Sequence, residues 1–352
     1  MLFRNAVVCG ALIVVASLSA AAQKGPIFPT AEQVRNLARD PDWGGLRTSC
    51  QADLNLVSHP IADFSPVPHY GSTGPVSNGK DAPESSLRRD SIAVYDLALC
   101  AEVSNDHRFS SRAEEILDNW AHTTKRIGTE QGTYGFNFYF PYALMGASLL
   151  AADASWHSDD FTKFVRNIVV PVINSGRPNN HGNWGVLLLL TSGGYLHDDA
   201  MISHARQRWL ELMRSQIAED GSLPLEICRS DTSNWCGGPT KGINGVHYTH
   251  WTLLPTTIAA EIFRNLGQDV YRTSEGQLLC KAYAKAATWT LHPETFPYFA
   301  ANSGKLLGLY DVNYFYILQA RCPTHDGQAV LDKYGTTAPD PLSIRVIYSG
   351  GD

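Results

Sequence analysis

The sequence predicts an all-α protein in which antiparallel helix hairpins form an α/α toroid, an incomplete barrel with a central cleft. Apolar residues recur at helical spacing along most of the 352 residues. Short polar turns marked by glycine separate these segments, and short connections place neighbouring helices antiparallel. Strand patterns are scarce, since only residues 343–348 have the pattern of an extended segment.

The first clear helix start is the capping box at residues 111–114, which apolar residues follow at helical spacing. Pro141 and Pro171 are expected to start, kink or end the helices that contain them. Residues 66–84 are rich in Pro, Gly and Ser, so we expect a long surface loop of the kind that often covers a site. The other predicted helices cover residues 85–104, 138–153, 159–174, 184–196, 199–218, 252–266, 274–291 and 310–321.

The N-terminus has the features of a signal peptide. Arg4 supplies positive charge, residues 6–18 form an apolar run too short to span a bilayer comfortably, and residues 20–22 are three alanines that suit cleavage. We therefore expect residues 1–22 to be removed. We expect residues 23–352 to form one domain that is exported to the periplasm or beyond.

The composition restricts the partners. Hydrophobic residues make up 44% of the chain and charged residues 18%, which suffices for a large core. The net charge of -6 gives no broad basic field, so nucleic acid is not an expected partner. No later segment has the length and hydropathy of a membrane span, and we expect a monomer. A polyanionic substrate would need cations gathered in a cleft.

Six cysteines follow the predicted signal peptide, and an even number in an oxidising compartment favours disulfides. We expect a local bond between Cys228 and Cys236. The two longer expected bonds are Cys50–Cys100 and Cys280–Cys322.

Three polar segments carry the residue types that catalysis requires. Asn180 and His181 precede an apolar helix, where they would either cap the helix or face the cleft, and Trp184 would be a core residue or a sugar platform. Arg229 would either pair with a nearby carboxylate such as Glu226 or grip a substrate carboxylate through its planar guanidinium.

The third segment contains Tyr248 between His247 and His250. An aromatic residue near a helix start usually serves packing, but a phenol can also transfer protons. Zinc binding by His181, His247 and His250 is conceivable, although their spacing is not the His-Glu-x-x-His pattern. We expect no metal and no cofactor.

Together these segments resemble a known family. Asn-Asn-His-x-x-Trp at 179–184, Asp-Gly-x-x-Pro-x-Glu-x-x-Arg at 220–229 and His-Tyr-x-x-Trp-x-Leu at 247–253 resemble the alginate lyases of polysaccharide lyase family five and their wider superfamily. The likeness runs over residues 85–320. It implies an α/α toroid that cleaves a uronic-acid polymer by β-elimination. One departure is an insert that separates the arginine from the tyrosine.

The resemblance also implies roles for single residues. In the family, the asparagine and histidine of the first motif contact the uronate carboxylate, and these positions are Asn180 and His181 here. The arginine of the second motif matches Arg229, and the proton-transferring tyrosine of the third matches Tyr248.

The chemistry explains why these residues suit an elimination. Loss of the C5 proton of a uronate moves negative charge onto its carboxylate, and hydrogen-bond donors lower that barrier. Asn180, Arg229 and His181 are the expected donors. If proton and leaving group lie on the same face of the sugar, Tyr248 serves as base and acid, helped by a cation that lowers its pKa. If they lie on opposite faces, His181 is the better base.

Further residues are expected to bind the polymer, with mannuronate-rich alginate as the first candidate and glucuronan as the second. A glycoside hydrolase is the main alternative, and it would need two carboxylates, for which Asp220 and Glu226 are available. A non-catalytic carbohydrate-binding protein is the other alternative. The expected substrate-binding residues are Trp184, Tyr134, Lys80, Arg88, Trp235, Lys241, His250 and Tyr314.

Overall fold

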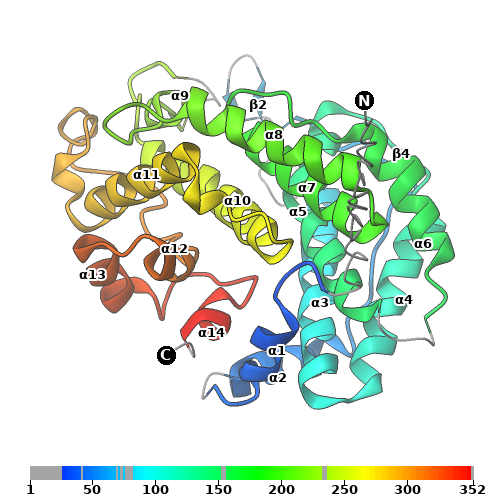
Figure 1. Cartoon of the computed structure of the whole chain (residues 1–352). Helices are drawn as coiled ribbons and strands as arrows, with labels where there is room; N and C mark the ends of the chain where they lie inside the picture. Colours follow the sequence, from blue (N-terminus) through cyan, green and yellow to red (C-terminus); the bar gives the residue numbers. More distant parts are fainter. Residues whose placement is uncertain are drawn as a thin grey trace, which may run out of the picture.

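A computed structural model describes residues 26–40, 43–68, 70–71, 74–75, 82–151, 156–231 and 236–349. Four long helices pack one against the next: α3 (Ala82–Ser104) on α5 (Glu130–Leu150), α5 on α7 (Asn180–Leu196), and α7 on α10 (Gly245–Asn265). Figure 1 shows that these helices belong to a curved array. The predicted all-α toroid is confirmed.

A second layer of helices covers this row. Helix α4 (His107–Thr123) packs on α3, α8 (Asp199–Gln216) on α7, and α11 (Ser274–Leu291) on α10, while α6 (Asp159–Phe164) packs on α4. In the chain, α4, α6 and α8 each lie between two inner helices, and α11 follows the last of them. Consecutive helices therefore alternate between the two layers, as antiparallel hairpins require.

The remaining elements are short. The helices are α1 (Ala31–Leu37), α2 (Trp43–Asp53), α9 (Pro224–Ile227), α12 (Phe315–Arg321), α13 (His325–Tyr334) and α14 (Ile344–Ser349). A π-helical turn (Val165–Val169) and 3₁₀ turns at Val170–Val172, Val270–Arg272, Pro293–Thr295 and Ala300–Asn302 complete them. Strand β1 (Asp63–Phe64) pairs in parallel with β4 (Arg126–Ile127), and β2 (Tyr70–Gly71) pairs antiparallel with β3 (Gly74–Pro75).

The two ends of the described chain meet and close the ring. Helix α14 packs on both α12 and α1, and α1 packs on α3 (Figure 1). Glu261 of α10, which is fully buried, accepts two hydrogen bonds of 2.9 Å from Arg321 of α12. It accepts a third, of 2.7 Å, from the Tyr348 hydroxyl of α14. One buried carboxylate therefore joins three helices.

The strand predicted at residues 343–348 is wrong, because this segment is helix α14. The Asp340 carboxylate accepts the backbone N–H groups of Ile344 and Arg345, each at 2.8 Å, and so satisfies the first turn. Ile344, Val346 and Ile347 are buried against the ring. These contacts with distant helices override the extended pattern of the segment.

Most predicted helices exist, but several boundaries move. The helix at 274–291 has the predicted bounds. The predicted start at 111–114 is wrong, because Asp106 caps α4 by accepting the N–H of Arg108 at 3.1 Å. Pro141 lies inside α5, which begins eight residues earlier than predicted, at Glu130 rather than residue 138. The predicted helix at 159–174 breaks into α, π and 3₁₀ turns around Pro171, which lacks an N–H.

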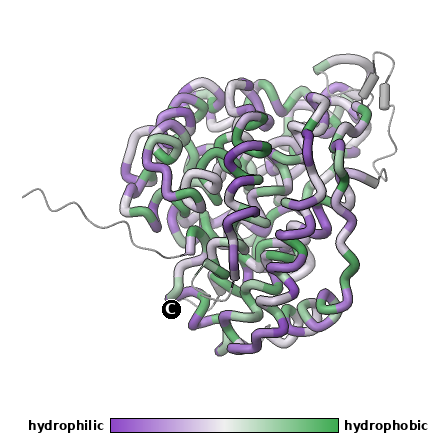
Figure 2. The backbone as a smooth tube through the Cα atoms, turned by 90° about the vertical axis from the view of Figure 1, so that its right-hand side faces the viewer, coloured by the Kyte–Doolittle hydropathy of each residue, from purple (hydrophilic) through white to green (hydrophobic). Residues whose placement is uncertain are grey.

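The predicted loop at 66–84 contains β2, β3 and the start of α3, and the rest of its middle lies outside the described residues. Helix α12 begins at Phe315, five residues after the predicted start. Along the helices in Figure 2, hydrophobic and hydrophilic residues alternate, which matches one buried and one exposed face.

The three disulfides are confirmed as Cys50–Cys100, Cys228–Cys236 and Cys280–Cys322. None of the described helices is long and apolar enough to cross a bilayer. The predicted signal peptide at residues 1–22 lies outside the described part of the chain.

Candidate active site

The N-terminal ends of the four inner helices meet at one end of the toroid. Gln131 in the first turn of α5 donates to Glu84 in the first turn of α3 at 2.8 Å. Tyr134 of α5 and His181 of α7 have ring centres 4.0 Å apart. The guanidinium of Arg229, which follows α9, lies over the ring of Tyr248 in the first turn of α10. Helix N-termini carry partial positive charge, so this end of the toroid favours an anionic ligand.

A buried carboxylate organises the centre of this site. Glu226 of α9 is only 1% exposed. Its Oε1 accepts the backbone N–H of Asn180 at 2.7 Å, which satisfies one of the free donors at the start of α7. Its Oε2 lies 3.2 Å from Nε of Arg229, which is itself 5% exposed. Burial raises the pKa of the Glu226 carboxyl, while Arg229 and Asn180 oppose that shift.

The amide of Asn180 points differently from the prediction. Its Nδ2 faces both oxygens of Glu226, at 3.2 and 3.1 Å, and its Oδ1 is buried without a hydrogen-bond partner among the described residues. An amide oxygen accepts and cannot bind a carboxylate. The helix-capping alternative is also not realised, because Asn179 occupies the cap position and makes no side-chain cap bond.

His181 is held as a neutral imidazole. Burial, and then the charges of Arg229 and Arg177, lower its pKa to about 4. Its ring packs against Tyr134 and, with centres 5.4 Å apart, against Phe138. Its Nδ1 is buried and has no hydrogen-bond partner within the described chain. A neutral imidazole offers one donor and one acceptor nitrogen, so His181 can donate to a carboxylate or accept a proton.

Backbone hydrogen bonds connect Arg229 with the first turn of α10. The guanidinium carbon lies 4.9 Å from the centre of the Tyr248 ring. The carbonyl of Arg229 accepts the N–H of Asn244 at 3.0 Å, and the carbonyl of Asn244 accepts the N–H of Tyr248 at 2.9 Å. The Cys228–Cys236 bond adjoins Arg229. Arg229 and Tyr248 are therefore in contact despite the insert in the sequence between them.

Tyr134, one of the residues predicted to bind substrate, lies at the same site. It is partly exposed, and its hydroxyl donates to Glu130, which also pairs with Arg177. Burial and the neighbouring Glu130 raise the pKa of Tyr134 to about 12, so this phenol stays protonated at neutral pH.

This arrangement has counterparts among known proteins. The sequence model of the family described as alginate lyase matches residues 51–296. The chain belongs to the alginate lyase family. A polysaccharide lyase of Stenotrophomonas maltophilia is 37% identical over 98 residues, a segment that covers 27% of this chain and 25% of that protein. The match thus spans only a quarter of that relative's length.

Solved structures of alginate lyases share the fold. The Bacteroides ovatus enzyme has a TM-score of 0.70 and 17% identity, covering 92% of this chain and 98% of that one. Alginate lyase A1-III of Sphingomonas species A1 has a TM-score of 0.66 and 17% identity, covering 90% and 97%. A histidine-to-alanine variant of A1-III complexed with tetrasaccharide has a TM-score of 0.72 and 16% identity, covering 94% and 97%.

Three residues predicted to bind substrate lie in the core instead. Trp184 is 1% exposed because it packs between Phe138 and Trp251. His250 is equally buried and bonds Tyr314 at 2.8 Å through Nδ1, and Tyr314 has no exposed surface. These side chains present no face to a polymer, so the prediction is wrong for Trp184, His250 and Tyr314. Their aromatic character reflects packing.

The other predicted binding residues fall into two groups. Arg88 on α3 is exposed, and Lys241 is exposed with its ammonium 5.4 Å from the centre of the Tyr298 ring. Lys80 and Trp235 lie outside the described residues.

The three histidines of the zinc hypothesis have separate environments. His181 packs on Tyr134, His247 pairs with Asp311, and His250 bonds Tyr314. Within the described ranges, no group of three or more His, Cys, Asp or Glu side chains is arranged to hold a metal ion.

The two carboxylates of the hydrolase hypothesis do not face one bond. Glu226 is enclosed by Asn180 and Arg229. The Asp220 side chain is 58% exposed and pairs with Lys285 of the outer helix α11 at 3.3 Å. A pair of catalytic carboxylates must flank the same glycosidic bond, so this geometry does not support hydrolysis.

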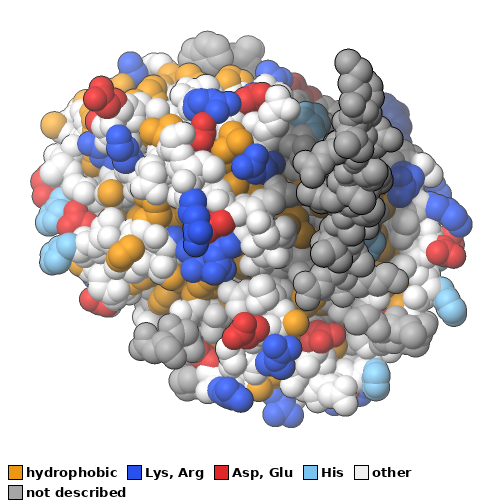
Figure 3. All heavy atoms as spheres, viewed as in Figure 1, with side chains coloured by type: hydrophobic (Ala, Val, Ile, Leu, Met, Phe, Trp, Pro, Cys, Tyr) orange, Lys and Arg blue, Asp and Glu red, His pale blue; other side chains and the backbone are white. Residues whose placement is uncertain are grey.

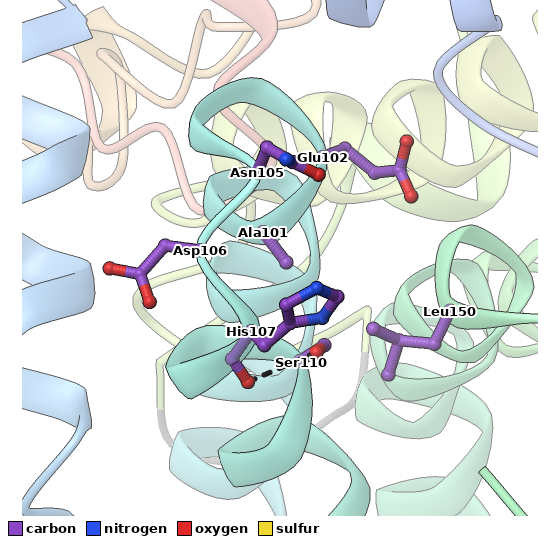
Figure 4. A pocket seen from close by; sticks show the side chains of 7 residues that line it. All are labelled: Ala101, Glu102, Asn105, Asp106, His107, Ser110 and Leu150. Carbon is purple, nitrogen blue, oxygen red and sulfur yellow. Dashed lines mark hydrogen bonds between the residues drawn. The ribbon is translucent and has the colours of Figure 1, made fainter. Parts of the chain in front are cut away.

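Figure 4 shows a pocket that does not belong to the site. It lies at the turn from α3 to α4, and its lining residues are Ala101, Glu102, Asn105, Asp106, His107, Ser110 and Leu150. Because a helix rises about 1.5 Å per residue, this end of α3 is roughly 25–30 Å from Glu84 at the other end. On the face in Figure 3, acidic and basic side chains are mixed among the coloured residues.

Glu226 takes a place in this site that the sequence does not predict. The sequence offers it only as a partner of Arg229 or as a hydrolytic carboxylate, whereas in the structure it binds both Arg229 and Asn180. The signal was present in the three-residue spacing of Glu226 and Arg229, which places both side chains on one face of a helical turn. The contact of Glu226 with Asn180, 46 residues away in the sequence, is visible only in the folded structure.

Proposed function

We propose that this protein is a polysaccharide lyase that cleaves a uronic-acid polymer by β-elimination. The observation that carries the proposal is the contact of Arg229 with Tyr248 beside a neutral, buried His181. Membership in the alginate lyase family supports it. Mannuronate-rich alginate is the first candidate substrate, and glucuronan is the second.

The substrate carboxylate would lie among the helix N-termini. As the C5 proton leaves, negative charge grows on this carboxylate, and donors already aimed at it lower the barrier. Arg229 and the N–H of His181 are the proposed donors. Asn180 would support them through Glu226, and its Oδ1 could accept a sugar hydroxyl.

Tyr248 is the proposed proton-transfer residue. The cationic guanidinium over its ring favours negative charge on the phenol oxygen. In an elimination on one face of the sugar, Tyr248 takes the C5 proton and then protonates the departing glycosidic oxygen. In an elimination across opposite faces, the neutral His181 takes the proton and Tyr248 acts as the acid. The structure is compatible with both pathways.

We further propose export of the chain and a single toroid domain that acts as a monomer. The three disulfides support an extracellular or periplasmic location, because such bonds persist in oxidising compartments. The predicted signal peptide accords with this.

The test is incubation with polymannuronate, polyguluronate and glucuronan. A lyase produces the ultraviolet absorbance of a new C4–C5 double bond, a hydrolase produces reducing ends without it, and a binding protein produces neither. Absence of the absorbance with all three polymers would reject the proposal.

A further inference from the structure

A second polar pair adjoins Tyr248. His247 Nδ1 lies 3.1 Å from Oδ2 of Asp311, and the two side chains are 35% and 45% exposed. The His247 ring centre is 5.5 Å from that of Tyr248. The pair therefore lies at the surface beside the proposed proton-transfer residue.

The imidazole of His247 is fixed on several sides. It stacks over Trp251 with ring centres 6.4 Å apart and an interplanar angle of 19°. On another side, Gly308 approaches so closely that a Cβ there would lie 2.3 Å from Nδ1. The backbone bond from Leu307 N–H to the Ile243 carbonyl, 2.9 Å long, ties this loop to the start of α10.

The orientation of the ring determines what it offers. Because Nδ1 faces Asp311, Nε2 is the nitrogen that a ligand can reach. Among the described residues Nε2 has no hydrogen-bond partner. His247 lowers the pKa of Asp311, although burial opposes that shift, and Arg88 and His250 contribute in the same direction as His247. Asp311 thus stays a carboxylate that can orient the ring and, when the ring is protonated, balance its charge.

An aromatic row connects this pair with His181. The ring centre of Phe138 lies 5.4 Å from that of His181 and 5.5 Å from that of Trp251. The ring of His247 stacks on Trp251. Phe138, Trp251 and His247 are all partly exposed. A polymer lying on this row would place one sugar at His181 and Tyr248 and a neighbouring sugar at His247.

We propose that His247, oriented by Asp311, is a subsite that binds the carboxylate of the uronate next to the sugar that loses its proton. The inference rests on the proposed lyase function. Every sugar of a polyuronate carries a carboxylate, so the subsite selects for charge on the neighbouring sugar and not on the reacting one. Because Nδ1–H donates to Asp311, Nε2 carries an N–H only when the ring is protonated, and an imidazolium N–H suits a carboxylate oxygen.

The experiment compares H247Q and D311N with the wild type on polymannuronate. We expect H247Q to raise KM about tenfold or more, the size of a lost hydrogen bond to a charged group, while kcat changes less than threefold. D311N keeps an acceptor for Nδ1 and should raise KM by less. The matched control is H325Q, because His325 also pairs with an aspartate, Asp326 at 3.4 Å, but lies on α13 with its side chain 95% exposed.

A second substrate identifies the ligand group. On a polymer whose carboxyl groups are partly reduced to alcohols, the KM of wild type should rise towards that of H247Q. Unchanged KM in H247Q, or a loss confined to kcat, overturns the subsite. If the wild type eliminates none of these polymers, the lyase proposal fails, and calorimetric binding of oligouronates to wild type and H247Q still tests the subsite. Circular dichroism and thermal melting exclude misfolding as the cause.

Discussion

The guanidinium carbon of Arg229 lies 4.9 Å from the centre of the Tyr248 ring. The Nε atom of Arg229 lies 3.2 Å from Oε2 of the buried Glu226 carboxylate. Arg229 therefore links a carboxylate that is inaccessible to solvent with a phenol in the first turn of α10. Through Arg229, the proposed role of Tyr248 is linked to Glu226.

Removal of the Tyr248 hydroxyl should greatly reduce turnover and leave substrate binding almost unchanged. We expect Tyr248→Phe to lower kcat by about 10²–10⁴-fold, the usual contribution of general acid–base catalysis, while the Kd for an oligouronate changes less than threefold. Stopped assays for kcat and calorimetry for Kd measure the two effects. Full activity in the variant would remove Tyr248 from the mechanism.

Glu226→Gln should impair both stability and catalysis. The glutamine can still accept the Asn180 N–H, but its own amide hydrogens oppose those of Arg229. Loss of one partner of a buried ion pair costs about 3–5 kcal/mol, so we expect a drop of that order in the free energy of unfolding and about a hundredfold fall in kcat/KM. Denaturant titration and initial rates measure these changes.

The control for this variant is Asp220→Asn. Asp220 is exposed and pairs with Lys285. Little change in either quantity is expected, because exposed ion pairs contribute little. Strong inactivation of Asp220→Asn would instead revive the hydrolase hypothesis.

The low pKa of His181 predicts the acid side of the pH profile. Since its pKa is about 4, the imidazole remains neutral when the pH falls well below the usual value of about 6.5, and kcat/KM should decline only as the pH passes through about 4. Unfolded His181 binds a proton at higher pH than folded His181 does. Its burial therefore lowers the stability of the fold as the pH falls from about 6.5 to about 4.

Arg177→Gln tests the cause of that shift. Arg177 is one of the cations that lower the pKa of His181, so its removal should move the acid limb of kcat/KM to higher pH. An acid limb near pH 6.5 in the wild type would contradict the neutral, buried state of His181.

Glu261 should matter for stability and not for catalysis. Its carboxylate joins α10, α12 and α14 at the far end of α10 from Tyr248. We expect Glu261→Gln to lower the free energy of unfolding by about 3 kcal/mol while kcat/KM stays within threefold. Thermal and denaturant unfolding measure the first, and Glu275→Gln, which removes the ion pair with the half-exposed Arg214, is the control. A large loss of kcat would show that ring closure and the site are coupled.

Chelators should leave the activity unchanged. In the proposed mechanism Arg229 and His181 stabilise the charge that a metal would otherwise neutralise. Rates measured before and after dialysis against EDTA check this. A loss of activity that added divalent cations restore would point to a metal-assisted reaction.

The helical fold follows from local pattern. Apolar spacing and short polar turns predicted α8 and α11 nearly to the residue, because an amphipathic helix records its buried face in its own sequence. The helix starts at Asn180 and Gly245 lie before the predicted ones, because buried polar residues and glycines there interrupt the apolar pattern. At residues 343–348, packing against α1 and α12 stabilises a helix in place of the predicted extended segment.

By itself the sequence determined the all-α class and the three disulfides, and it predicted Asn180, His181, Arg229 and Tyr248 as a candidate group. Only the tertiary structure decided that Glu226 binds two of them, that the Asn180 amide turns inward, and that Trp184, His250 and Tyr314 are core residues. The physical reason is that burial and hydrogen-bond direction depend on segments far apart in the chain. A residue's own neighbours in sequence record its helical spacing but not which distant group will share its environment.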